Sequence, residues 1–537
     1  MSRALRPAGR RVPLLAALLV LLGGAPAAGN GAYTHVHISR LAVAALPPGE
    51  LRDVLSTPAV AAWLEAGSVF PDSGYVTGHP YGEESHWPRF QTAFLDFLRE
   101  RYQGQLDTLE AQQEAAFLLG DLSHGMADQL FDHTLFERTL EVDGEGERGI
   151  DELADYFLVV DEGVIVETRA TGPYEDLARI LTDDAATPTT ADEIRQGMEG
   201  IQSVLTVQRM LARSRYLEAW QTYPFLGTHL SNPEAPGSLP HLGLLVAAAW
   251  QSAWAQLRGT ASLDEDLLVA TIPRDGAENF PVDASSDGDA WRRVGLLFAY
   301  GVRRSQVSSL LSLRDPDGAA VPIRIRTPYG TELGNFVMLE PEQPLAYDTW
   351  YTAEVAAGVE DLRGDRSTVS YQVRFRTRCA PDRLADCPPL RPPLVAGEIP
   401  TEVPPEPGPD AGGGADAGAG ADTGAGADIG EGADAGAPRD AAETGFDGGE
   451  AGGSGGADVA DPGADAASPG PDPTAATDVV VDAAPGGGGS GAGCAAGSAA
   501  APAPLALLGL GIGLATLVRR RFWSARRDGE RAWRRQP

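Results

Sequence analysis

The chain has 537 residues, enough for two or three domains, and its formal net charge is −33. This charge argues against nucleic acid as a partner held by bulk electrostatic attraction. The chain contains no lysine, so arginine supplies every basic side chain other than histidine.

A secretory signal peptide is predicted for residues 1–28. A basic head, residues 1–11, precedes a short apolar run, residues 12–24, and small residues lead to a cleavage position after Ala27 or Ala28. The alternative is an N-terminal membrane anchor. The apolar run disfavours it, because a spanning helix needs about 20 apolar residues. We therefore expect an exported protein.

Residues 29–262 are predicted to form an almost entirely α-helical domain. Apolar residues recur there at spacings of three and four, which is the helical period. Residues 67–87, rich in glycine, proline, aspartate and histidine, are predicted to be a loop. The predicted helices are 41–66, 88–102, 106–137, 151–160, 174–181, 191–216 and 242–257.

The predicted helix around residues 115–137 combines an apolar stripe with two candidate metal ligands. His124 and Asp128 are four residues apart and therefore share a face, which lies opposite the stripe. Zinc binds imidazole and carboxylate ligands, so one face is predicted to pack and the other to bind metal. The stripe consists of Leu119, Leu122, Met126 and Leu130.

Residues 263–378 are predicted to form a β-sandwich. Short runs rich in β-branched and aromatic residues are separated by turn residues, and the last run alternates apolar with polar side chains. The segments PRDGAENFPVD and LAYDTWYTAEV resemble bacterial Ig-like domains, which have this architecture. The predicted strands are 267–272, 293–300, 321–327, 350–356 and 369–377.

Residues 379–493 are predicted to be a disordered acidic linker. Aspartate recurs every six residues from Asp410 to Asp440 in a background of glycine and alanine. A calcium-binding β-roll also repeats glycine and aspartate, but it needs an apolar residue in each repeat, which is missing here. Cys379 and Cys387 are close enough in sequence to close a small disulfide loop outside the cytoplasm.

Residues 494–537 are predicted to anchor the chain in a membrane. Residues 499–518 are long and apolar enough to span a bilayer, and the arginines after this segment would stay cytoplasmic. Cys494, the apolar segment and the basic end resemble the tripartite sorting tail of myxobacterial surface proteins. That resemblance implies a sorting protease that acts near Cys494. The alternative is an uncleaved single-pass helix.

Histidines gather in the predicted helical domain together with aspartates. The chain has eight histidines, and six of them lie within residues 35–133. Clustered imidazoles and carboxylates on helices are what a site for several zinc ions requires.

Four motifs occur in order in this region: AYTHVHIS, AGSVFPDSGY, EESHWPRF and LLGDLSHGMADQLFDH. They resemble the zinc-dependent phospholipase C family, and most closely the N-terminal catalytic region of glycosylphosphatidylinositol-specific phospholipase D. The likeness covers residues 32–160 and implies an all-α fold. Single-strand-specific nucleases share that fold and its zinc design, so the fold alone does not settle the substrate.

The resemblance implies a site of two or three zinc ions. His35 would bind one ion. Asp72 and His86 would bind another together with His124, and Asp128 would bridge the two. Asp72 would also act as the general base that orients or deprotonates the attacking water.

The third metal position departs from the family pattern, because the helix offers both Asp132 and His133. On a regular helix Asp132 stays about 80° from His124, whereas His133 falls about 180° away on the side of the apolar stripe. Phase therefore favours Asp132, and a one-residue bulge would favour His133. Asp151 and Asp155 keep the family's four-residue spacing with carboxylates only. The third ion would bind weakly, be harder than zinc, or be absent.

Other histidines and one aspartate have structural interpretations. His37 shares a face with His35 only in an extended segment, and His79 is a candidate for the mouth of the site. Asp121 is predicted to support His124 without touching metal. His229 and His241 are predicted to be structural.

Together these features predict a surface-anchored, zinc-dependent phosphodiesterase with a membrane-surface substrate. The resemblance implies hydrolysis of phospholipids or glycosylphosphatidylinositol-type lipids through a metal-activated water. No nucleic-acid partner is expected. The alternatives are a nuclease of the same fold and a non-catalytic surface binding or adhesion protein with a degraded metal site.

Overall fold

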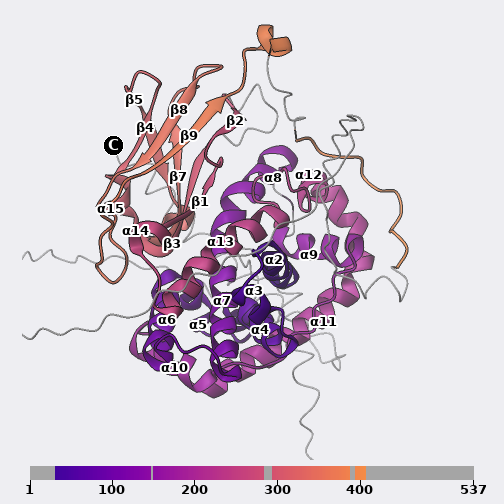
Figure 1. Ribbon diagram of the computed structural model, residues 1–537. Helices are drawn as coiled ribbons and strands as arrows, with labels where there is room; N and C mark the ends of the chain where they lie inside the picture. Colours follow the sequence, from indigo (N-terminus) through magenta and orange to yellow (C-terminus); the bar gives the residue numbers. More distant parts are fainter. Residues whose placement is uncertain (1–30, 145, 147–148, 283–292, 387–393, 407–537) are drawn as a thin grey trace, which may run out of the picture. The chain divides into compact units, whose positions relative to one another are not determined.

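The computed structural model describes residues 31–144, 146, 149–282, 293–386 and 394–406 (Figure 1). The predicted signal peptide, the predicted membrane span and most of the predicted linker lie outside these ranges. Within them, no helix is long and apolar enough to cross a membrane.

The first part of the described chain is helical, as predicted. Several helix ends carry standard signals: Thr108 and Thr190 cap the N-termini of α7 and α11, and Pro88 starts α6. The helices are α2 (Ala32–Ala45), α3 (Glu50–Leu55), α4 (Pro58–Thr77), α5 (Tyr81–Ser85), α6 (Pro88–Tyr102), α7 (Leu109–Phe131), α8 (Glu137–Asp143), α9 (Ile150–Asp161), α10 (Tyr174–Asp183), α11 (Ala191–Thr222), α12 (Pro224–His229) and α13 (Leu239–Arg258).

Helix α7 is buried on every side and not only along its apolar stripe. Every residue from Glu114 to Phe131 is buried, and α4, α2, α6 and α13 all contact the helix (Figure 1). The indole N–H of Trp250 on α13 donates to the carbonyl of Leu119 at 2.7 Å. The ligand-bearing face of α7 is therefore enclosed by other helices.

The predicted loop at residues 67–87 is mostly wrong, because α4 continues through it to Thr77 and α5 occupies Tyr81–Ser85. Pro71 lies inside α4, and glycines flank it on both sides. Residues of these types are typical of loops. Gly67 and Gly74 are instead needed for close packing, since a Cβ on Gly67 would lie 2.1 Å from the carbonyl oxygen of Phe117. Asp72 is consequently a helical residue.

The predicted helix 106–137 is regular only as far as Phe131. A single π-helical turn, η1 (Asp132–Phe136), joins α7 to α8. A π-turn adds a residue to one helical turn and shifts the phase of the residues after it. The regular-helix geometry predicted for the last ligands therefore does not hold there.

The second part of the described chain is a β-sandwich, as predicted, and a short 3-10 helix, η3 (Pro381–Asp386), comes after it. One sheet has the order β1-β3-β7-β6 and the other β2-β9-β8-β4-β5. Most neighbours are antiparallel, and β2 and β9 are parallel. The strands are β1 (Leu268–Ile272), β2 (Ala277–Phe280), β3 (Val294–Arg303), β4 (Leu311–Arg314), β5 (Ala320–Val321), β6 (Ile323–Arg326), β7 (Leu333–Pro341), β8 (Trp350–Val355) and β9 (Tyr371–Thr377).

Three strands, β2, β4 and β7, are absent from the sequence prediction. Strand β7 is the longest of these, and all its residues after Leu333 are buried. Phe336 and Met338 belong to the core of the helical domain, whereas Val337 and Leu339 belong to the core of the sandwich. A strand buried on both faces has no apolar–polar alternation, which is why the period-2 pattern does not reveal it.

Part of the predicted linker has a defined path along the helical domain. Leu394 and Val403 pack against its core, and the carbonyl of Val395 accepts a hydrogen bond from His229 at 2.8 Å. Cys379 is disulfide-bonded. Cys387 lies outside the described residues.

Candidate metal centre

His35 is positioned by the N-terminus of α2. The two carboxylate oxygens of Asp155, on α9, accept hydrogen bonds from the backbone N–H groups of Tyr33 at 3.2 Å and Thr34 at 2.9 Å. These amides have no partner within a helix, so a carboxylate there stabilises the helix end. Gly31 leaves room for the contact, because a Cβ would lie 2.4 Å from the Asp155 carboxylate. Asp155 thus has a structural role, and its metal role stays a prediction.

Asp72 is brought to α7 by close packing of α4, which makes the most extensive helix–helix contact in the described chain. Two glycines allow it: Gly67 on α4 and Gly120 on α7. A Cβ on Gly120 would lie 2.2 Å from the carbonyl oxygen of Leu64. The same approach places the carbonyl of Ser68 against His124.

His86 lies between α5 and α6, and a third glycine lets it reach the site. A Cβ on Gly125 of α7 would lie 2.3 Å from the carbonyl oxygen of His86. The His86 imidazole donates from Nδ1 to the carbonyl of Gly82 at 2.5 Å, which fixes the ring. Its Nε2 atom therefore faces α7.

Five predicted ligands meet at one point. His35 stacks on His124 with ring centroids 3.5 Å apart and planes 12° apart. The Asp128 carboxylate lies 3.2 Å from His35 Nε2, 3.5 Å from His86 Nε2 and 3.6 Å from His124 Nε2. Asp72 Oδ1 lies 3.8 Å from His124 Nε2. Two overlapping groups have metal-binding geometry: His35, Asp72 and His124, and His86, His124 and Asp128.

The two imidazoles of His86 and His124 require a cation between them. Their Nε2 atoms are 2.9 Å apart. Each Nδ1 atom faces a backbone carbonyl, of Gly82 and Ser68 respectively, and a carbonyl can only accept. Both neutral rings therefore carry their hydrogen on Nδ1 and a lone pair on Nε2. Two lone pairs at this separation repel unless a proton or metal ion lies between them, and the same donor set is the one zinc uses.

Burial governs the protonation of the site in the metal-free protein. Desolvation raises the pKa of Asp72 to about 6, opposed by His35 and His86. Burial lowers the pKa of His124 well below its usual value, and the neighbouring imidazoles of His35 and His86 lower it further. Burial lowers the pKa of His35, but the carboxylates of Asp128, Asp72 and Asp155 together outweigh that effect, so the pKa is raised. Of the five residues, Asp72 is the most accessible, with 13% of its side chain exposed.

A second group of carboxylates adjoins the first. Burial raises the pKa of Asp151 well above its usual value, and the negative charges of nearby carboxylates, that of Asp132 most of all, raise it further. Burial raises the pKa of Asp155 to about 7. Several buried carboxylates in one place are costly unless cations balance them. Asp132 and Asp151 therefore lie where a further cation would be stabilised.

His133 lies within the π-turn, next to Asp132, so the choice between these two residues as ligands stays a prediction. Its ring lies edge-on against Tyr329, with centroids 5.2 Å apart, and its Nε2 accepts from the Tyr329 backbone N–H at 3.4 Å. It does not join the Leu/Met stripe, as a regular helix would require. Neither metal-binding group contains His133, Asp132, Asp151 or Asp155.

The remaining candidates have other surroundings. His37 is helical and faces away from His35, with its Nε2 3.3 Å from Glu162. His79 lies 3.5 Å from Glu193. His229 forms a hydrogen bond with the side chain of Asn232, and His241 accepts one from the backbone N–H of Gly237. Asp121 does not contact His124 Nδ1, which faces Ser68. Both oxygens of Asp121 are buried without a hydrogen-bond partner among the described residues.

One residue at the site carries no signal in the sequence. Tyr329 comes after strand β6 in the sandwich, and its hydroxyl contacts the carboxylate of Asp132 at 2.7 Å. It lies almost 200 residues beyond the ligands in a short Pro-Tyr-Gly turn. Sequence patterns locate ligands by local spacing, so they cannot detect a partner supplied by a distant turn.

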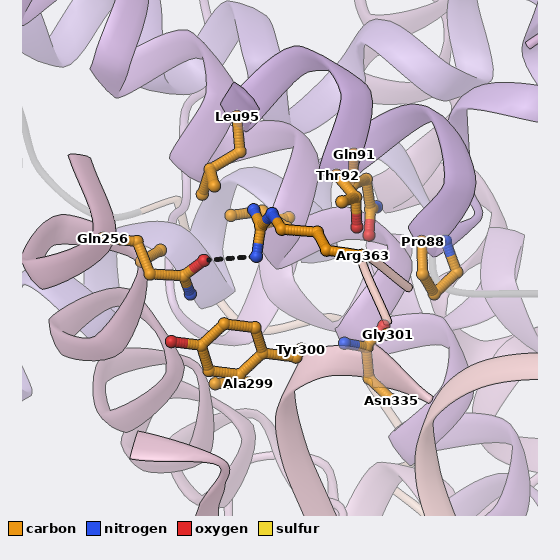
Figure 2. Close-up of a pocket in the computed structure, with 12 residues that line it drawn as sticks. Pro88, Gln91, Thr92, Leu95, Gln256, Ala299, Tyr300, Gly301, Asn335 and Arg363 are labelled. Carbon is orange, nitrogen blue, oxygen red and sulfur yellow. Dashed lines mark hydrogen bonds between the residues drawn. The ribbon is translucent and has the colours of Figure 1, made fainter. Parts of the chain in front are cut away.

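A small cavity between the helices and the sandwich lies apart from the metal centre. Gln256, Tyr300 and Arg363 line it, with Arg363 donating to Gln256 at 3.2 Å (Figure 2). None of the nine predicted site residues lines this cavity.

Comparison with protein families matches both folded parts. Residues 34–196 match the family described as zinc dependent phospholipase C, and residues 266–377 match the bacterial Ig-like domain. The first match contains all nine predicted site residues. No curated protein matches the chain, so the likeness to glycosylphosphatidylinositol-specific phospholipase D stays a prediction.

Solved structures of a surface-layer protein give weak overall similarity. The N-terminal part of the bacterial S-layer protein SbsC matches at 10% identity and a TM-score of 0.16, covering 62% of this chain and 79% of that one. Domains 1–6 of the same protein match at 10% identity and a TM-score of 0.16, covering 61% of this chain and 46% of that one. Scores this low carry no functional information.

Proposed function

We propose that this chain, which carries a zinc-dependent phospholipase C domain followed by a bacterial Ig-like domain, is a zinc-dependent phosphodiesterase that hydrolyses phospholipids. His35, Asp72, His86, His124 and Asp128 would hold the metal. The number of ions, two or three, is part of the proposal. The family match supports the substrate class, and the donor geometry supports the metal.

The facing Nε2 atoms of His86 and His124 carry the proposal. Backbone carbonyls fix both rings so that two lone pairs meet at 2.9 Å inside the protein. A histidine pair kept only for packing would have to hold an extra proton to form an N–H···N bond across this gap, whereas burial lowers the pKa of His124. The arrangement is favourable when a cation binds.

The chain's own residues can then be assigned tasks. When bound, zinc would supply Lewis-acid activation of the attacking water and neutralise charge on the phosphodiester. Asp72 is the site carboxylate with the most solvent access, which suits a group that accepts a proton from water or substrate. We assign Asp72 Oδ1 or Oδ2 as the proton acceptor. His35, His124 and Asp128 are buried and hold their positions.

Location and substrate detail extend the proposal. An exported protein with a C-terminal anchor, displayed at the cell surface, would meet membrane lipids from outside, and a sorting protease acting near Cys494 belongs to this proposal. Glycosylphosphatidylinositol-type lipids are a candidate substrate alongside ordinary phospholipids. Cleavage on either side of the phosphate, the C-type or the D-type reaction, is consistent with the same ligand set.

The test compares two histidines on one helix. We expect purified full-length protein to contain zinc by elemental analysis and to hydrolyse phosphatidylcholine or phosphatidylinositol vesicles. His35→Ala should lose metal and reduce hydrolysis by about 100-fold or more, a loss typical of a dismantled metal centre. His37→Ala is the matched control, because His37 pairs with Glu162 outside the site, and it should retain both properties.

The products and a second substrate separate the alternatives. Diacylglycerol with a phosphorylated head group identifies C-type cleavage, and phosphatidate identifies D-type cleavage. Hydrolysis of single-stranded DNA without lipid hydrolysis would identify a nuclease. Zinc binding with neither activity would favour an adhesion protein, and absence of zinc from the wild type would refute the proposal.

A further inference from the structure

The sandwich is attached to the helical domain through an apolar junction. Ile272, Leu297, Phe336 and Met338, from β1, β3 and β7, are buried in the same cluster as the helical core. The backbone N–H of Asn335 on β7 donates to Gln129 of α7 at 3.0 Å. Burying four large apolar side chains is favourable because it removes their surface from water. The junction therefore holds the sandwich in a defined position next to α7.

Polar contacts reinforce the same junction. Arg363 pairs with Asp96 on α6 and also donates to Gln256 on α13 (Figure 2). Arg293 pairs with Glu137 at the start of α8. These contacts fix the sandwich on three helices, so any sandwich residue that reaches the metal centre is held there by the junction as a whole.

Tyr329 is that residue. It lies in η2 (Pro328–Gly330), the turn between β6 and β7. Its ring packs edge-on between Trp87, beside the ligand His86, and His133 on the π-turn, with centroids 5.3 Å and 5.2 Å away. Its hydroxyl donates to Asp132 Oδ2 at 2.7 Å and lies 3.2 Å from the Asp128 backbone carbonyl. It thus contacts the backbone of one predicted ligand and the side chain of another.

The backbone of Tyr329 is held in an unfavourable conformation. Its φ is 55° and its ψ is 8°, in the left-handed region that non-glycine residues rarely adopt. Such a conformation is strained and persists only where surrounding contacts impose it. A turn placed there for packing alone would be better served by glycine or asparagine. This conformation instead allows the Tyr329 side chain to contact Asp132, Trp87 and His133.

We propose that Tyr329 is a positioning residue of the metal centre, so that the Ig-like domain supplies part of the site. The phenol hydroxyl fixes the Asp132 carboxylate beside Asp128 and Asp151 and thereby strengthens binding of the metal ion nearest to Asp132. This inference rests on the proposed function for the presence of metal. It goes beyond that function by assigning a role to a residue outside residues 34–196, the part that matches the phospholipase family.

The inference assigns Tyr329 an action through Asp132 and no contact with substrate. A hydrogen bond from a neutral donor to a carboxylate fixes the orientation of its two oxygens, and partners of this kind typically change metal affinity by 10–100-fold. The hydroxyl, and not the ring, is therefore the group to remove. Tyr329→Phe keeps the ring contacts with Trp87 and His133.

Tyr371 offers a matched control. It is another sandwich tyrosine, and its hydroxyl donates to the backbone carbonyl of Asp264 at 2.8 Å. Its hydroxyl contacts, Leu263 and Asp264, lie in the short helix α14 (Leu263–Asp266) and not in the metal centre. Tyr371→Phe removes a tyrosine hydroxyl of the sandwich without touching the site.

The experiment titrates metal-free full-length protein with Co²⁺, monitored by its visible absorption, and with Zn²⁺ in competition. We expect Tyr329→Phe to weaken one binding step by about tenfold to 100-fold and to change the Co²⁺ spectrum of that step. Asp132→Asn should weaken the same step, and the double variant should be no worse than Asp132→Asn alone. Tyr371→Phe should match the wild type.

Three outcomes would overturn the inference. They are unchanged binding steps and spectrum in Tyr329→Phe, additive effects of Tyr329→Phe and Asp132→Asn, and an equal loss in Tyr371→Phe. If any of these occurs while the wild type binds zinc and hydrolyses lipid, the proposed function stands and only this inference fails. If the wild type binds neither Co²⁺ nor Zn²⁺, both fail together.

Discussion

At the scale of single residues, hydrogen-bond partners on the side away from the metal hold the candidate ligands in place. The carbonyls of Ser68 and Gly82 set the tautomers of His124 and His86, and the amides of Tyr33 and Thr34 bind Asp155. These partners leave the metal-facing atoms as acceptors, which suits a cation. The buried carboxylates nearby then remain partly protonated until a metal displaces their protons.

Metal affinity should therefore rise with pH. In the metal-free protein burial raises the pKa of Asp72 to about 6 and that of Asp155 to about 7. Below these values the carboxyls hold protons that a metal must displace, so we expect zinc affinity to increase from about pH 5.5 to about pH 7.5 and then level off. Calorimetric titration in two buffers of different ionisation enthalpy would measure the released protons. A constant affinity over this range, with no proton release, would contradict the expectation.

Asp121 should weaken the fold at neutral pH. Its carboxyl is buried without a hydrogen-bond partner among the described residues, and burial raises its pKa well above the usual value. A raised folded-state pKa means that the folded protein binds the proton more tightly, so this contribution to stability is lost as pH rises. The free energy of unfolding of Asp121→Asn should rise relative to that of the wild type by about 1.4 kcal/mol for each pH unit above the pKa of Asp121 in the unfolded chain. This rise should stop once the pH passes the pKa of Asp121 in the folded protein.

Denaturant unfolding of metal-free Asp121→Asn and wild-type protein at several pH values would measure this gain. Both proteins share every other titrating group, so their difference isolates Asp121. A difference independent of pH would mean that a cation or other partner keeps Asp121 ionised in the folded protein.

At the scale of secondary-structure elements, the site depends on glycines at helix crossings. Gly67, Gly120 and Gly125 allow α4 and the segment at His86 to approach α7 more closely than a methyl group permits. A helix-interior glycine costs roughly 0.5–1 kcal/mol relative to alanine, so these positions lose helical stability in exchange for the approach. The separation of Asp72 and His86 from His124 is set by these crossings.

Gly120→Ala should therefore damage both stability and metal binding. The added Cβ would lie 2.2 Å from the Leu64 carbonyl oxygen, which cannot move without shifting α4. Overpacking of this kind costs roughly 1–3 kcal/mol, and the shift should lower zinc affinity as well. The control is Gly149→Ala, because nothing lies within 4 Å of the added atom and its φ is −65°. Unfolding curves and zinc titrations of both variants would check this, and equal behaviour would show that the crossing adapts freely.

At the scale of the whole described chain, the helical domain and the sandwich have separate apolar cores that strand β7 joins. Alternate residues of β7 enter the two cores, with Phe336 and Met338 on the helical side and Val337 and Leu339 on the other. A strand used by both domains couples their unfolding, because neither face can be exposed without loss of the other's packing. The sandwich is therefore more than a spacer.

We expect the two domains to unfold in a single transition that responds to one junction residue. Met338 is fully buried, so Met338→Ala should lower the free energy of unfolding by roughly 2–5 kcal/mol. Met210, which is 76% exposed, supplies the control, and Met210→Ala should change little. Calorimetry, together with spectroscopic probes placed in each domain, would follow the unfolding of the two domains. Two separate transitions, only one of them sensitive to Met338→Ala, would show that the domains are independent.

Sequence alone determined the helical domain, the sandwich after it, and the candidate ligands on α2, α4, α7 and α9. Helical periodicity and the four motifs are local, so their signals survive without knowledge of the fold. Strand β7 was not predicted, because a strand that is buried on both faces has no alternation of apolar and polar residues. The part of α4 that contains Asp72 was predicted as a loop, because the glycines that allow close helix packing there are also typical of loops.

Only the tertiary structure decided how the ligands are held and which domain completes the site. His86 and His124 are 38 residues apart in the chain, yet their Nε2 atoms lie 2.9 Å apart, fixed by carbonyls that no side-chain pattern marks. Tyr329 reaches Asp132 across 197 residues, from a turn in the other domain. Sequence patterns record spacing along one element, whereas a metal centre is assembled by contacts between elements, and packing at glycine crossings and at the domain junction sets those contacts.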